Sequence, residues 1–336
     1  MTRTAVLAVD GGNSKTDLAL VGGDGSLLAL VRGPLSSPQH LGVDGCLAVI
    51  EQLLADALND ARLDEGGKIA EVASLLLAGV DFPAEEDAVR DAVEERGWAR
   101  RVHVGNDTFA VLRAGTERGW GVAVTCGAGI NCVGVGPDGR HARFPALGEI
   151  TGDWGGGYDL GKAAVFAAAR SEDGRGPRTS LEHAVPAHFG LEAPSRLAEA
   201  IHFGQIPERR VIELAPVVLA EAADDAVAAE IVQRLASEVV ALARVALKRL
   251  DLTNEPVEVL LGGGVLQDAD GDLLAAIDGG LRAHAPAVTV RPTASAAVVG
   301  AALLGLDQLD AGGQAQQRLR RELADAFLRL DGVRVG

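Results

Sequence analysis

The feature that most constrains the fold is a strand, a glycine turn and a second strand, which occur together twice. Residues Thr4–Asp10 and Lys15–Val21 are strand-like and flank the turn Gly11-Gly12-Asn13-Ser14. Residues Gly119–Cys126 and Ile130–Val135 flank a second, equally short glycine turn. Apolar runs joined by such turns are typical of β-hairpins. The repetition predicts two domains of one topology.

Strands and helices alternate after each hairpin, which predicts an α/β chain. We expect further strands at Leu27–Arg32, Val72–Ala78, Arg101–Gly105, Pro256–Leu261 and Thr289–Arg291. We expect helices over Val43–Asn59, Ala84–Arg96, Thr108–Ala114, most of 161–250, Ser295–Gly305 and Gln314–Leu330. The expected domains are 1–116 and 117–310, followed by a C-terminal helix in 311–336 for which packing on the first domain is one option.

The charge balance excludes some partners. The chain has 47 acidic and 31 basic residues, a formal net charge of −16. Nucleic acids and anionic lipids need Lys and Arg to neutralise their phosphates. We therefore expect that the protein binds neither nucleic acid nor membranes. Any bound anion must be held by backbone amides, helix N-termini or a metal ion. The 43 glycines fit this expectation, because glycine lets backbone N–H groups approach a phosphate.

Cysteine usage and the N-terminal sequence favour a cytoplasmic protein. The three cysteines, Cys46, Cys126 and Cys132, follow no disulfide or zinc spacing. The first residues enter a strand without the apolar segment of a signal peptide. The sequence also contains no H-E-x-x-H, G-x-S-x-G or G-K-[ST] motif.

Two glycine turns are candidate phosphate sites. In Asp10-Gly11-Gly12-Asn13-Ser14-Lys15-Thr16, a carboxylate at a strand end can hold Mg²⁺ while the turn amides face a phosphate. In Cys126-Gly127-Ala128-Gly129, small residues leave amides exposed in the same way. Each turn alone is equally compatible with an ordinary hairpin, but the pair at the start of two successive domains favours a nucleotide site.

Three further segments could take part in binding. Gly262-Gly263-Gly264 follows an apolar strand, and backbone without side chains there suits a flat ring such as adenine. Asn106-Asp107 ends a strand, where the alternative is a simple helix N-cap. The segment 148–158 combines Glu149, Asp153 and Trp154 with five glycines, and carboxylates beside an aromatic ring commonly bind sugar hydroxyls.

Together, in this order and spacing, these motifs resemble the actin, sugar kinase and heat-shock ATPase superfamily over residues 5–305. Within it they are similar to the N-acetylglucosamine kinase branch of the BadF/BadG/BcrA/BcrD-type ATPases. The resemblance implies two ribonuclease-H-like α/β domains with ATP and Mg²⁺ in a central interdomain cleft. It also implies phosphorylation of the 6-hydroxyl of an amino sugar, and dimers are common in the family.

The resemblance implies a role for each motif. Asp107 would be the catalytic base, and Asp10 the metal-side carboxylate. The sugar would be held by Ser37, Gln39, Asn106, Asp107, Asn131, Gly148, Glu149 and Asp153, with Ser36 on the same closing loop as Ser37. The nucleotide would be held by Gly11, Gly12, Asn13, Ser14, Lys15, Thr16, Gly127, Ala128, Gly129, Gly263, Gly264 and Gln267.

The chain departs from the family at three of these positions. Cys126 and Ala128 stand where the family often has hydroxyl side chains, so phosphate binding would depend more on amides. Glu149 stands where N-acetylglucosamine kinases have a neutral or histidine side chain. An additional carboxylate suits a protonated 2-amino group, so we expect glucosamine ahead of N-acetylglucosamine as the substrate.

Two other functions stay open at this point. An activator ATPase of the 2-hydroxyacyl-CoA dehydratase type would need paired cysteines around an iron–sulfur cluster, and Cys126 and Cys132 lie in the phosphate-loop hairpin instead. A sugar sensor without turnover could use the same fold. Sugar-kinase-like repressors carry an added basic helix-turn-helix, and because this acidic sequence starts in its first strand we expect no DNA binding.

Overall fold

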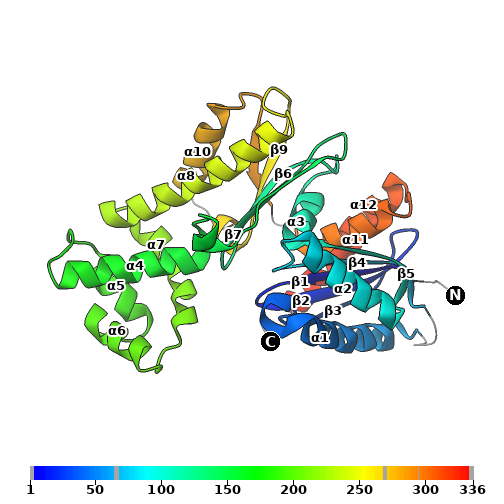
Figure 1. Ribbon diagram of the computed structural model, residues 1–336, viewed down its shortest axis with the longest axis horizontal. Coiled ribbons are helices and arrows are strands. Elements are labelled where there is room, and N and C mark those ends of the chain that lie inside the picture. Colours follow the sequence, from blue (N-terminus) through cyan, green and yellow to red (C-terminus); the bar gives the residue numbers. More distant parts are fainter. Residues whose placement is uncertain (1–3, 64–67, 268–270, 294, 333–336) are drawn as a thin grey trace. The chain divides into compact units, whose positions relative to one another are not determined.

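The fold is described from a computed structural model that covers residues 4–63, 68–267, 271–293 and 295–332. The chain divides into two compact units (Figure 1). Unit 1 comprises Met1–Trp120 and Ala294–Gly336, and unit 2 comprises Gly121–Thr293. Each contains one five-stranded sheet, so the predicted α/β class with two domains is confirmed.

Unit 1 is built on a mixed sheet in the order β3-β2-β1-β4-β5. The strands are β1 (Thr4–Gly11), β2 (Lys15–Gly22), β3 (Leu27–Pro34), β4 (Ala70–Leu77) and β5 (Ala99–Asn106). The first three pair antiparallel as a meander, whereas β4 and β5 run parallel to β1. The carboxyl ends of β1, β4 and β5 therefore meet at one edge of the sheet.

Helices cover both faces of this sheet, because β1 is apolar on both sides. Leu7 and Val9 belong to a core with α1 (Pro38–Ala61) and α2 (Pro83–Arg96). The alternate residues Val6 and Ala8 belong to a second core. That core is completed by α3 (Asp107–Gly115), α11 (Ala297–Asp307) and α12 (Gly313–Gly332).

Helix α11 belongs to unit 1, whereas the sequence analysis placed its residues in the second domain. The helix packs closely against α3, and a Cβ at Gly300 would lie 1.8 Å from the carbonyl oxygen of Ala110. A Cβ at Gly305 would likewise lie 2.3 Å from a methyl carbon of Val6. Glycine spacing on α11 was not recognised as a packing face, which is why the boundary near residue 310 differs from the structure.

The C-terminal helix α12 packs on unit 1. Glu322 accepts a hydrogen bond from the Leu27 backbone N–H at 2.7 Å, and Arg318 pairs with Asp24 at 2.6 Å. Leu319 and Leu323 are fully buried in the second core. Burial of a leucine side chain contributes about 1.5–3 kcal/mol, so these two residues attach the helix firmly to unit 1, where it packs on α11 and β3.

Unit 2 repeats the topology of unit 1. Its sheet order is β10-β9-β6-β7-β8, with β6, β7 and β8 antiparallel and β9 and β10 parallel to β6. The strands are β6 (Gly121–Cys126), β7 (Ile130–Val135), β8 (His141–Arg143), β9 (Glu258–Gly262) and β10 (Thr289–Pro292). The duplicated hairpin predicted from the sequence is therefore confirmed as a duplicated sheet.

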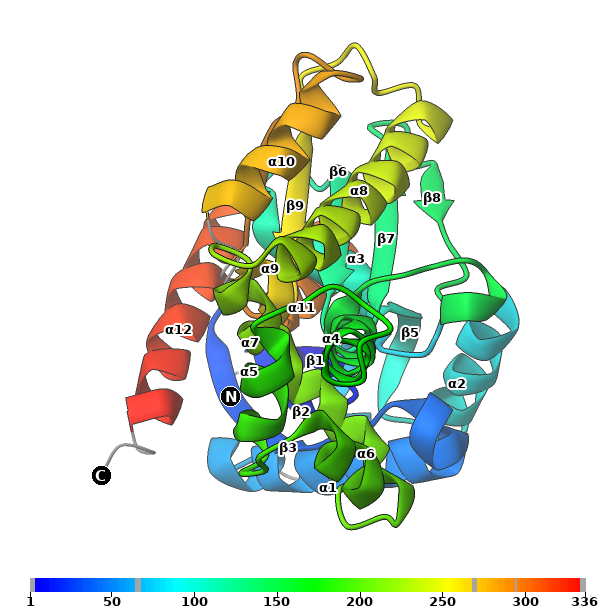
Figure 2. The ribbon, with the colours of Figure 1, turned by 90° about the vertical axis from the view of Figure 1, so that its left-hand side faces the viewer.

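The helices of unit 2 form a large insertion between β8 and β9. In order they are η1 (Gly148–Ile150), α4 (Gly156–Glu172), α5 (Leu181–His188), α6 (Pro194–His202), η2 (Glu208–Leu214), α7 (Ala215–Glu221) and α8 (Ala226–Arg249). Two more, α9 (Gly264–Gln267) and α10 (Gly271–Arg282), follow β9. Figure 2 shows the long α8 beside α10. No helix in the described part of the chain has the length and apolar character to cross a membrane.

Candidate functional site

In unit 1, the candidate residues gather at the carboxyl edge of three parallel strands. The register aligns Gly11 with Leu77, and Leu77 with Asn106, across β1, β4 and β5. Asp10 is one residue before Gly11, and Asp107 is one residue after Asn106. The expected metal-side carboxylate and the expected base are far apart in the sequence, but they lie at the same edge of the sheet. This is where ligands bind in open α/β sheets.

The first glycine turn leaves two amides available. The Gly12 N–H donates to the Lys15 carbonyl at 2.9 Å, which closes the turn. Within the described residues, the N–H groups of Asn13 and Ser14 have no hydrogen-bond partner. Successive amides of this kind form an anion-binding concavity. The turn therefore has the geometry of a phosphate cradle.

Gly11 and Thr16 shape this turn from beneath. A Cβ at Gly11 would lie 2.5 Å from both the Ser36 hydroxyl and a methyl carbon of Leu77. Thr16 is fully buried, donates its hydroxyl to the Pro34 carbonyl at 2.7 Å and lies 2.7 Å from the Ser36 hydroxyl. These residues position the loop rather than present a side chain at its surface.

Asp10 has an electrostatic environment that a cation would relieve. The pKa of its carboxyl is raised to about 8, mainly by burial and further by the neighbouring carboxylates of Asp107 and Asp17. Lys15 and Arg32 oppose this shift. Mg²⁺ is typically bound by one or two carboxylates together with substrate phosphates and water. The chemistry of this donor set therefore fits a magnesium–nucleotide complex.

The described residues contain no group of three or more His, Cys, Asp or Glu side chains placed to hold a metal ion by themselves. A Mg²⁺ ion at Asp10 would accordingly depend on phosphate and water for its other ligands. Such dependence is the usual behaviour of Mg²⁺ in sites that bind nucleotides.

Asp107 is the first residue of α3. Asn106 is its N-cap and accepts a hydrogen bond from the Thr108 N–H at 2.9 Å. Burial raises the pKa of the Asp107 carboxyl to about 6, against the lowering effect of hydrogen bonds from Thr108. The side chain still keeps part of its surface accessible. A half-buried carboxylate with a pKa near 6 is suited to accept a proton at neutral pH.

The expected sugar loop of unit 1 is held by the connection after β4. Ser37, the N-cap of α1, donates its hydroxyl to the Ala78 carbonyl at 2.9 Å. Gln39 packs over Gly79, where a Cβ would lie 2.7 Å from the Gln39 Cβ. Gly79 has φ +75°, a conformation that favours glycine. Ser37 and Gln39 are thereby brought to the same edge as Asp10 and Asp107.

Asp81 lies two residues beyond Gly79 and was not among the site residues predicted from the sequence. Its carboxylate accepts a hydrogen bond from the Asn106 side-chain amide at 2.8 Å. The available signal was a glycine and an aspartate directly after a buried parallel strand, a position that favours ligand-binding side chains.

In unit 2, the second glycine turn organises the start of α4. The Gly156 N–H donates to the Cys126 sulfur at 3.1 Å, and the Gly157 and Tyr158 N–H groups donate to the Gly127 and Ala128 carbonyls at 2.8 and 3.0 Å. The N-terminal amides of α4 are consequently used within the protein. An anion would have to bind to the turn itself.

That turn offers the same kind of cradle as the first. The Gly127 N–H donates to the Gly129 carbonyl at 3.0 Å, and in the part of the chain with described coordinates the Ala128 and Gly129 N–H groups have no partner. A Cβ at Gly127 or Gly129 would meet nothing within 4 Å. There is therefore open space over the amides for a bound group.

The expected sugar loop of unit 2 is closed on itself. The Asp153 N–H donates to the Gly148 carbonyl at 3.0 Å, and the Thr151 hydroxyl makes a short hydrogen bond to the Asp153 carboxylate. Asn131 lies nearby in sequence on β7 and accepts from the Cys132 N–H at 2.7 Å. Ala146 has φ +53°, a strained conformation for a residue other than glycine.

Glu149 is placed differently from the expectation. Its side chain is 86% exposed and lies 3.4 Å from the Lys162 ammonium. Lys162 also lies 5.4 Å from the ring centroid of Tyr158, and the Tyr158 hydroxyl donates to Glu208 at 2.8 Å. Lys162 therefore lies within ion-pair distance of Glu149, a pairing that was not predicted from the sequence.

Trp154 is covered by a cation. The Arg234 guanidinium from α8 lies 4.0 Å from the centroid of its ring. One face of the Trp154 ring is therefore occupied by a cation–π contact.

The third glycine segment links β9 to α9 and packs against the end of β6. Gly263 has φ +81°, and a Cβ there would lie 2.4 Å from the Cys126 carbonyl oxygen. Gly264 opens onto free space, with nothing within 4 Å of a Cβ. Gln267 donates its amide to the Thr293 carbonyl at 2.8 Å, so its side chain stabilises the end of β10.

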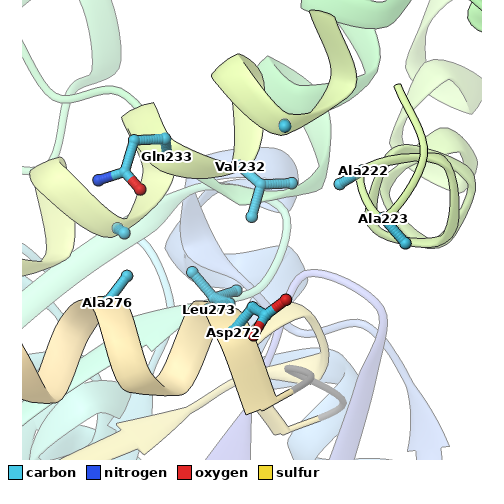
Figure 3. A pocket seen from close by; sticks show the side chains of 9 residues that line it. Ala222, Ala223, Val232, Gln233, Asp272, Leu273 and Ala276 are labelled. Carbon is cyan, nitrogen blue, oxygen red and sulfur yellow. The ribbon is translucent and has the colours of Figure 1, made fainter. Parts of the chain in front are cut away.

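A small pocket of about 160 Å³ lies between α8, α10 and the two alanines that follow α7 (Figure 3). Val232 and Leu273 make it apolar, and Gln233 and Asp272 add an amide and a carboxylate at its rim. Its other lining residues are the alanines Ala222, Ala223, Ala229, Ala236 and Ala276.

The three cysteines are buried as separate thiols. Burial raises the pKa of Cys46 and of Cys126 to about 12 and raises that of Cys132 further. Thiols in this state are poor metal ligands, because the thiolate is the ligand form. They do not fit an iron–sulfur cluster.

Comparisons with known proteins agree with this arrangement. The chain is 28% identical over 267 residues to the N-acetylmuramic acid/N-acetylglucosamine kinase of Clostridium acetobutylicum, covering 78% of this chain and 86% of that protein. It is 29% identical over 188 residues to the N-acetyl-D-glucosamine kinase of Dictyostelium discoideum, covering 54% and 59%.

A solved structure of a proposed N-acetylglucosamine kinase from Chromobacterium violaceum matches with a TM-score of 0.72 at 25% identity, covering 91% of this chain and 100% of that one. A ROK family glucokinase from Streptomyces griseus, in complex with glucose and AMPPNP, shares the fold with a TM-score of 0.53 at 20% identity, covering 89% and 98%. The BadF/BadG/BcrA/BcrD ATPase family model matches residues 7–305. The two duplicated sheets, their paired glycine turns and this match over nearly the whole chain show that the protein belongs to the BadF/BadG/BcrA/BcrD ATPase family.

Proposed function

We propose that this protein transfers the γ-phosphoryl group of ATP to the 6-hydroxyl of an amino sugar. The observation that carries the proposal is the carboxyl edge of the unit 1 sheet, where Asp10 and Asp107 lie beside a turn with two available amides. Phosphoryl transfer needs alignment and charge stabilisation more than covalent catalysis. Carboxylates and amides of this kind supply both.

Each residue has a definite part in this reaction. Asp107 accepts the proton of the attacking hydroxyl, and the amides of Asn13 and Ser14 bind phosphate oxygens. The amides of Ala128 and Gly129 form the second phosphate cradle in unit 2. Asp10 would hold Mg²⁺, which neutralises the phosphate charge when it is bound. The central cleft expected between the two domains stays a prediction.

The pocket between α8 and α10 is our candidate for the purine. Its small alanine side chains leave room for a flat aromatic ring, and Gln233 and Asp272 can pair with ring nitrogens and an amino group. Ala236→Leu should raise the KM for ATP while leaving the KM for the sugar unchanged. An equal rise in both KM values would contradict this assignment.

Between the two sugars, N-acetylglucosamine is the first candidate and glucosamine the second. The named relatives act on N-acetylated sugars. Glucosamine was expected because of Glu149, but Lys162 compensates that charge and the side chain is largely exposed. A carboxylate in this state attracts an ammonium group only weakly. Glucosamine is retained because Glu149 still distinguishes this chain from the pattern of the family.

A coupled assay with Mg-ATP decides among these options. Glucosamine, N-acetylglucosamine, N-acetylmuramic acid, mannosamine and glucose are compared by kcat/KM, and the product is located by NMR. Glu149→Gln should lower kcat/KM for glucosamine alone if this carboxylate recognises the amine. Turnover with none of the sugars, alongside tight sugar binding, would favour the non-catalytic sensor instead. A dimer and a cytoplasmic location stay predictions from the sequence.

A further inference from the structure

The connection between β4 and α2, residues 78–82, touches each part of the site in unit 1. The Ala78 N–H donates to the Gly11 carbonyl at 2.8 Å, next to the first phosphate turn. The Ala78 carbonyl accepts from the Ser37 hydroxyl at 2.9 Å. Gly79 supports the side chain of Gln39. No motif in the sequence analysis included this segment.

Asp81 links the same connection to the catalytic base. Its carboxylate accepts a hydrogen bond from the Asn106 amide nitrogen at 2.8 Å. The Asn106 amide oxygen in turn accepts from the Thr108 N–H at 2.9 Å. Asn106 is only 2% exposed, so its side chain is committed to these contacts within the protein.

The chemistry of the carboxylate fixes the orientation of the amide. An ionised carboxylate only accepts hydrogen bonds, so it selects the Asn106 orientation with nitrogen toward Asp81 and oxygen toward α3. That orientation is the one that caps α3. If the amide turned over, its NH₂ group would face the Thr108 N–H. Two buried hydrogen-bond donors would then face each other without an acceptor.

The backbone at Asp81 is held in place by the side chain of Glu85. The Asp81 backbone N–H donates to the Glu85 carboxylate at 2.8 Å, and the Phe82 N–H donates to the same oxygen at 3.0 Å. These bonds fix the start of α2 and therefore the position of Asp81. The chain of contacts runs from α2 through Asp81 and Asn106 to the first turn of α3.

We propose that Asp81 is a positioning residue for phosphoryl transfer, which holds Asp107 in place through Asn106. Asp107 lies between Asn106 and Thr108 in the chain, and both neighbours are fixed by this arrangement. A shift of about 1 Å at a reacting group can lower a rate by about 100-fold. The inference rests on the proposed kinase function, and it adds a residue outside the motifs that suggested that function.

The test compares Asp81→Ala with Asp81→Asn and with the control Asp91→Ala. Asp91 is an exposed residue of α2, the helix that follows Asp81. Asparagine at position 81 keeps an oxygen that accepts from Asn106, whereas alanine removes it. For Asp81→Ala we expect kcat about 10- to 100-fold lower with the KM for ATP within twofold. Asp81→Asn should recover most of the loss, and Asp91→Ala should match the wild type.

Several results would overturn the proposal. These are an unchanged kcat in Asp81→Ala, an Asp81→Asn variant as impaired as Asp81→Ala, or a loss found mainly in the KM for ATP. Circular dichroism melting shows whether Asp81→Ala is folded. If it is not, Asn106→Asp and the double variant Asp81→Asn/Asn106→Asp replace it. The double variant reverses donor and acceptor, so it should exceed Asn106→Asp in kcat; failure to do so would overturn the proposal.

A measurement without turnover separates this inference from the proposed function. In the wild type and Asp81→Asn, the Asn106 side-chain NH₂ should exchange slowly with solvent in NMR spectra, and in Asp81→Ala at least tenfold faster. Equal exchange rates of this NH₂ group in all three proteins would contradict the inference, independently of any activity. A wild type that phosphorylates no sugar would contradict the proposed function alone.

Discussion

The two sheets have the same strand order and pairing, yet their carboxyl edges carry different chemistry. The penultimate residue of β1 is Asp10, and the penultimate residue of β6 is Thr125. The residue after β5 is Asp107, and the residue after β10 is Thr293. Unit 1 therefore presents carboxylates where unit 2 presents neutral hydroxyl groups.

This difference indicates that the shared topology determines where functional residues can lie, whereas the side chains at those positions determine which chemistry each unit can perform. Both glycine turns leave two amides available, which suits phosphate in either unit. Only the edge of unit 1 concentrates negative charge, which requires a cation or protonation, as the raised pKa values of Asp10 and Asp107 show. We therefore expect proton transfer and metal binding at unit 1. At unit 2 we expect phosphate to be bound by uncharged groups, the backbone amides and hydroxyls.

The largest effect is expected from Asp107→Asn. Asparagine keeps the shape of the side chain but cannot accept the proton, and general base catalysis contributes about 10²–10⁴-fold. We expect kcat to fall within that range while binding of ATP, measured by calorimetry, stays within threefold. A variant that keeps more than a tenth of the wild-type kcat would show that the base is elsewhere.

The direct comparison of the two edges pairs Asp10→Asn with Thr125→Val. Loss of the carboxylate should lower kcat by about 10²–10³-fold and raise the Mg²⁺ concentration needed for half-maximal rate, because charge stabilisation of the phosphates is lost. Among the described residues the Thr125 hydroxyl has no hydrogen-bond partner, so its removal should change kcat less than tenfold. Equal losses in both variants would erase the distinction between the units.

The pH dependence should report the Asp107 carboxyl. Its pKa is raised to about 6 from an ordinary value of 3.8, and only the ionised form accepts a proton. A Mg²⁺ ion at Asp10 would keep that carboxylate ionised. With saturating Mg-ATP, the kcat/KM for the sugar should therefore be level above about pH 7 and fall about tenfold per pH unit below pH 6. The sign for stability is opposite, since a raised pKa means that folding favours the protonated form. The stability contributed by the protonated carboxyl is therefore lost as the pH rises from about 4 to about 6, and it stays lost above pH 6.

Asp107→Asn should accordingly melt at a higher temperature than the wild type at pH 7.5 and lose that advantage at pH 4.5. A wild-type activity profile that stays flat from pH 7 to pH 5 would contradict the role of this group. It would leave the contrast between the two edges without a functional consequence.

A smaller effect is expected where the two glycine segments of unit 2 meet. Gly263→Ala places a Cβ 2.4 Å from the Cys126 carbonyl oxygen at φ +81°, which should destabilise the protein by about 1–3 kcal/mol. Gly264→Ala is the matched control for stability, because its Cβ would meet nothing within 4 Å. Urea unfolding followed by circular dichroism measures both, and equal midpoints would contradict the close contact.

The smallest effect is expected from Cys126→Ser. A serine hydroxyl can accept the Gly156 N–H as the sulfur does, so kcat and the KM for ATP should stay within about twofold. Cys126→Val removes the acceptor and leaves a buried N–H unpaired, which costs about 1–3 kcal/mol. If valine is tolerated as well as serine, the turn does not depend on this hydrogen bond.

The sequence by itself determined the architecture and most of the candidate site. Alternating apolar strands and two short glycine turns leave few folds, so the repeated hairpin predicted the repeated sheet. Asp10 and Asp107 were recognisable because each stands at the end of an apolar strand, next to a glycine turn or a helix start, and because the motifs around them resemble those of a known kinase family. Local patterns of this kind depend on neighbours within a few residues, which a sequence displays.

The tertiary structure alone decided which side chains are already committed. The structure places the amides of Asn106 and Gln267, both predicted to contact ligands, against Asp81 and Thr293, respectively. It adds Lys162 at 3.4 Å from Glu149, which was expected to select the substrate. Helix α11 belongs to unit 1, where its glycines allow close contact with α3 and β1. Such pairings join residues far apart in the chain, and their partners depend on distances that only folding defines.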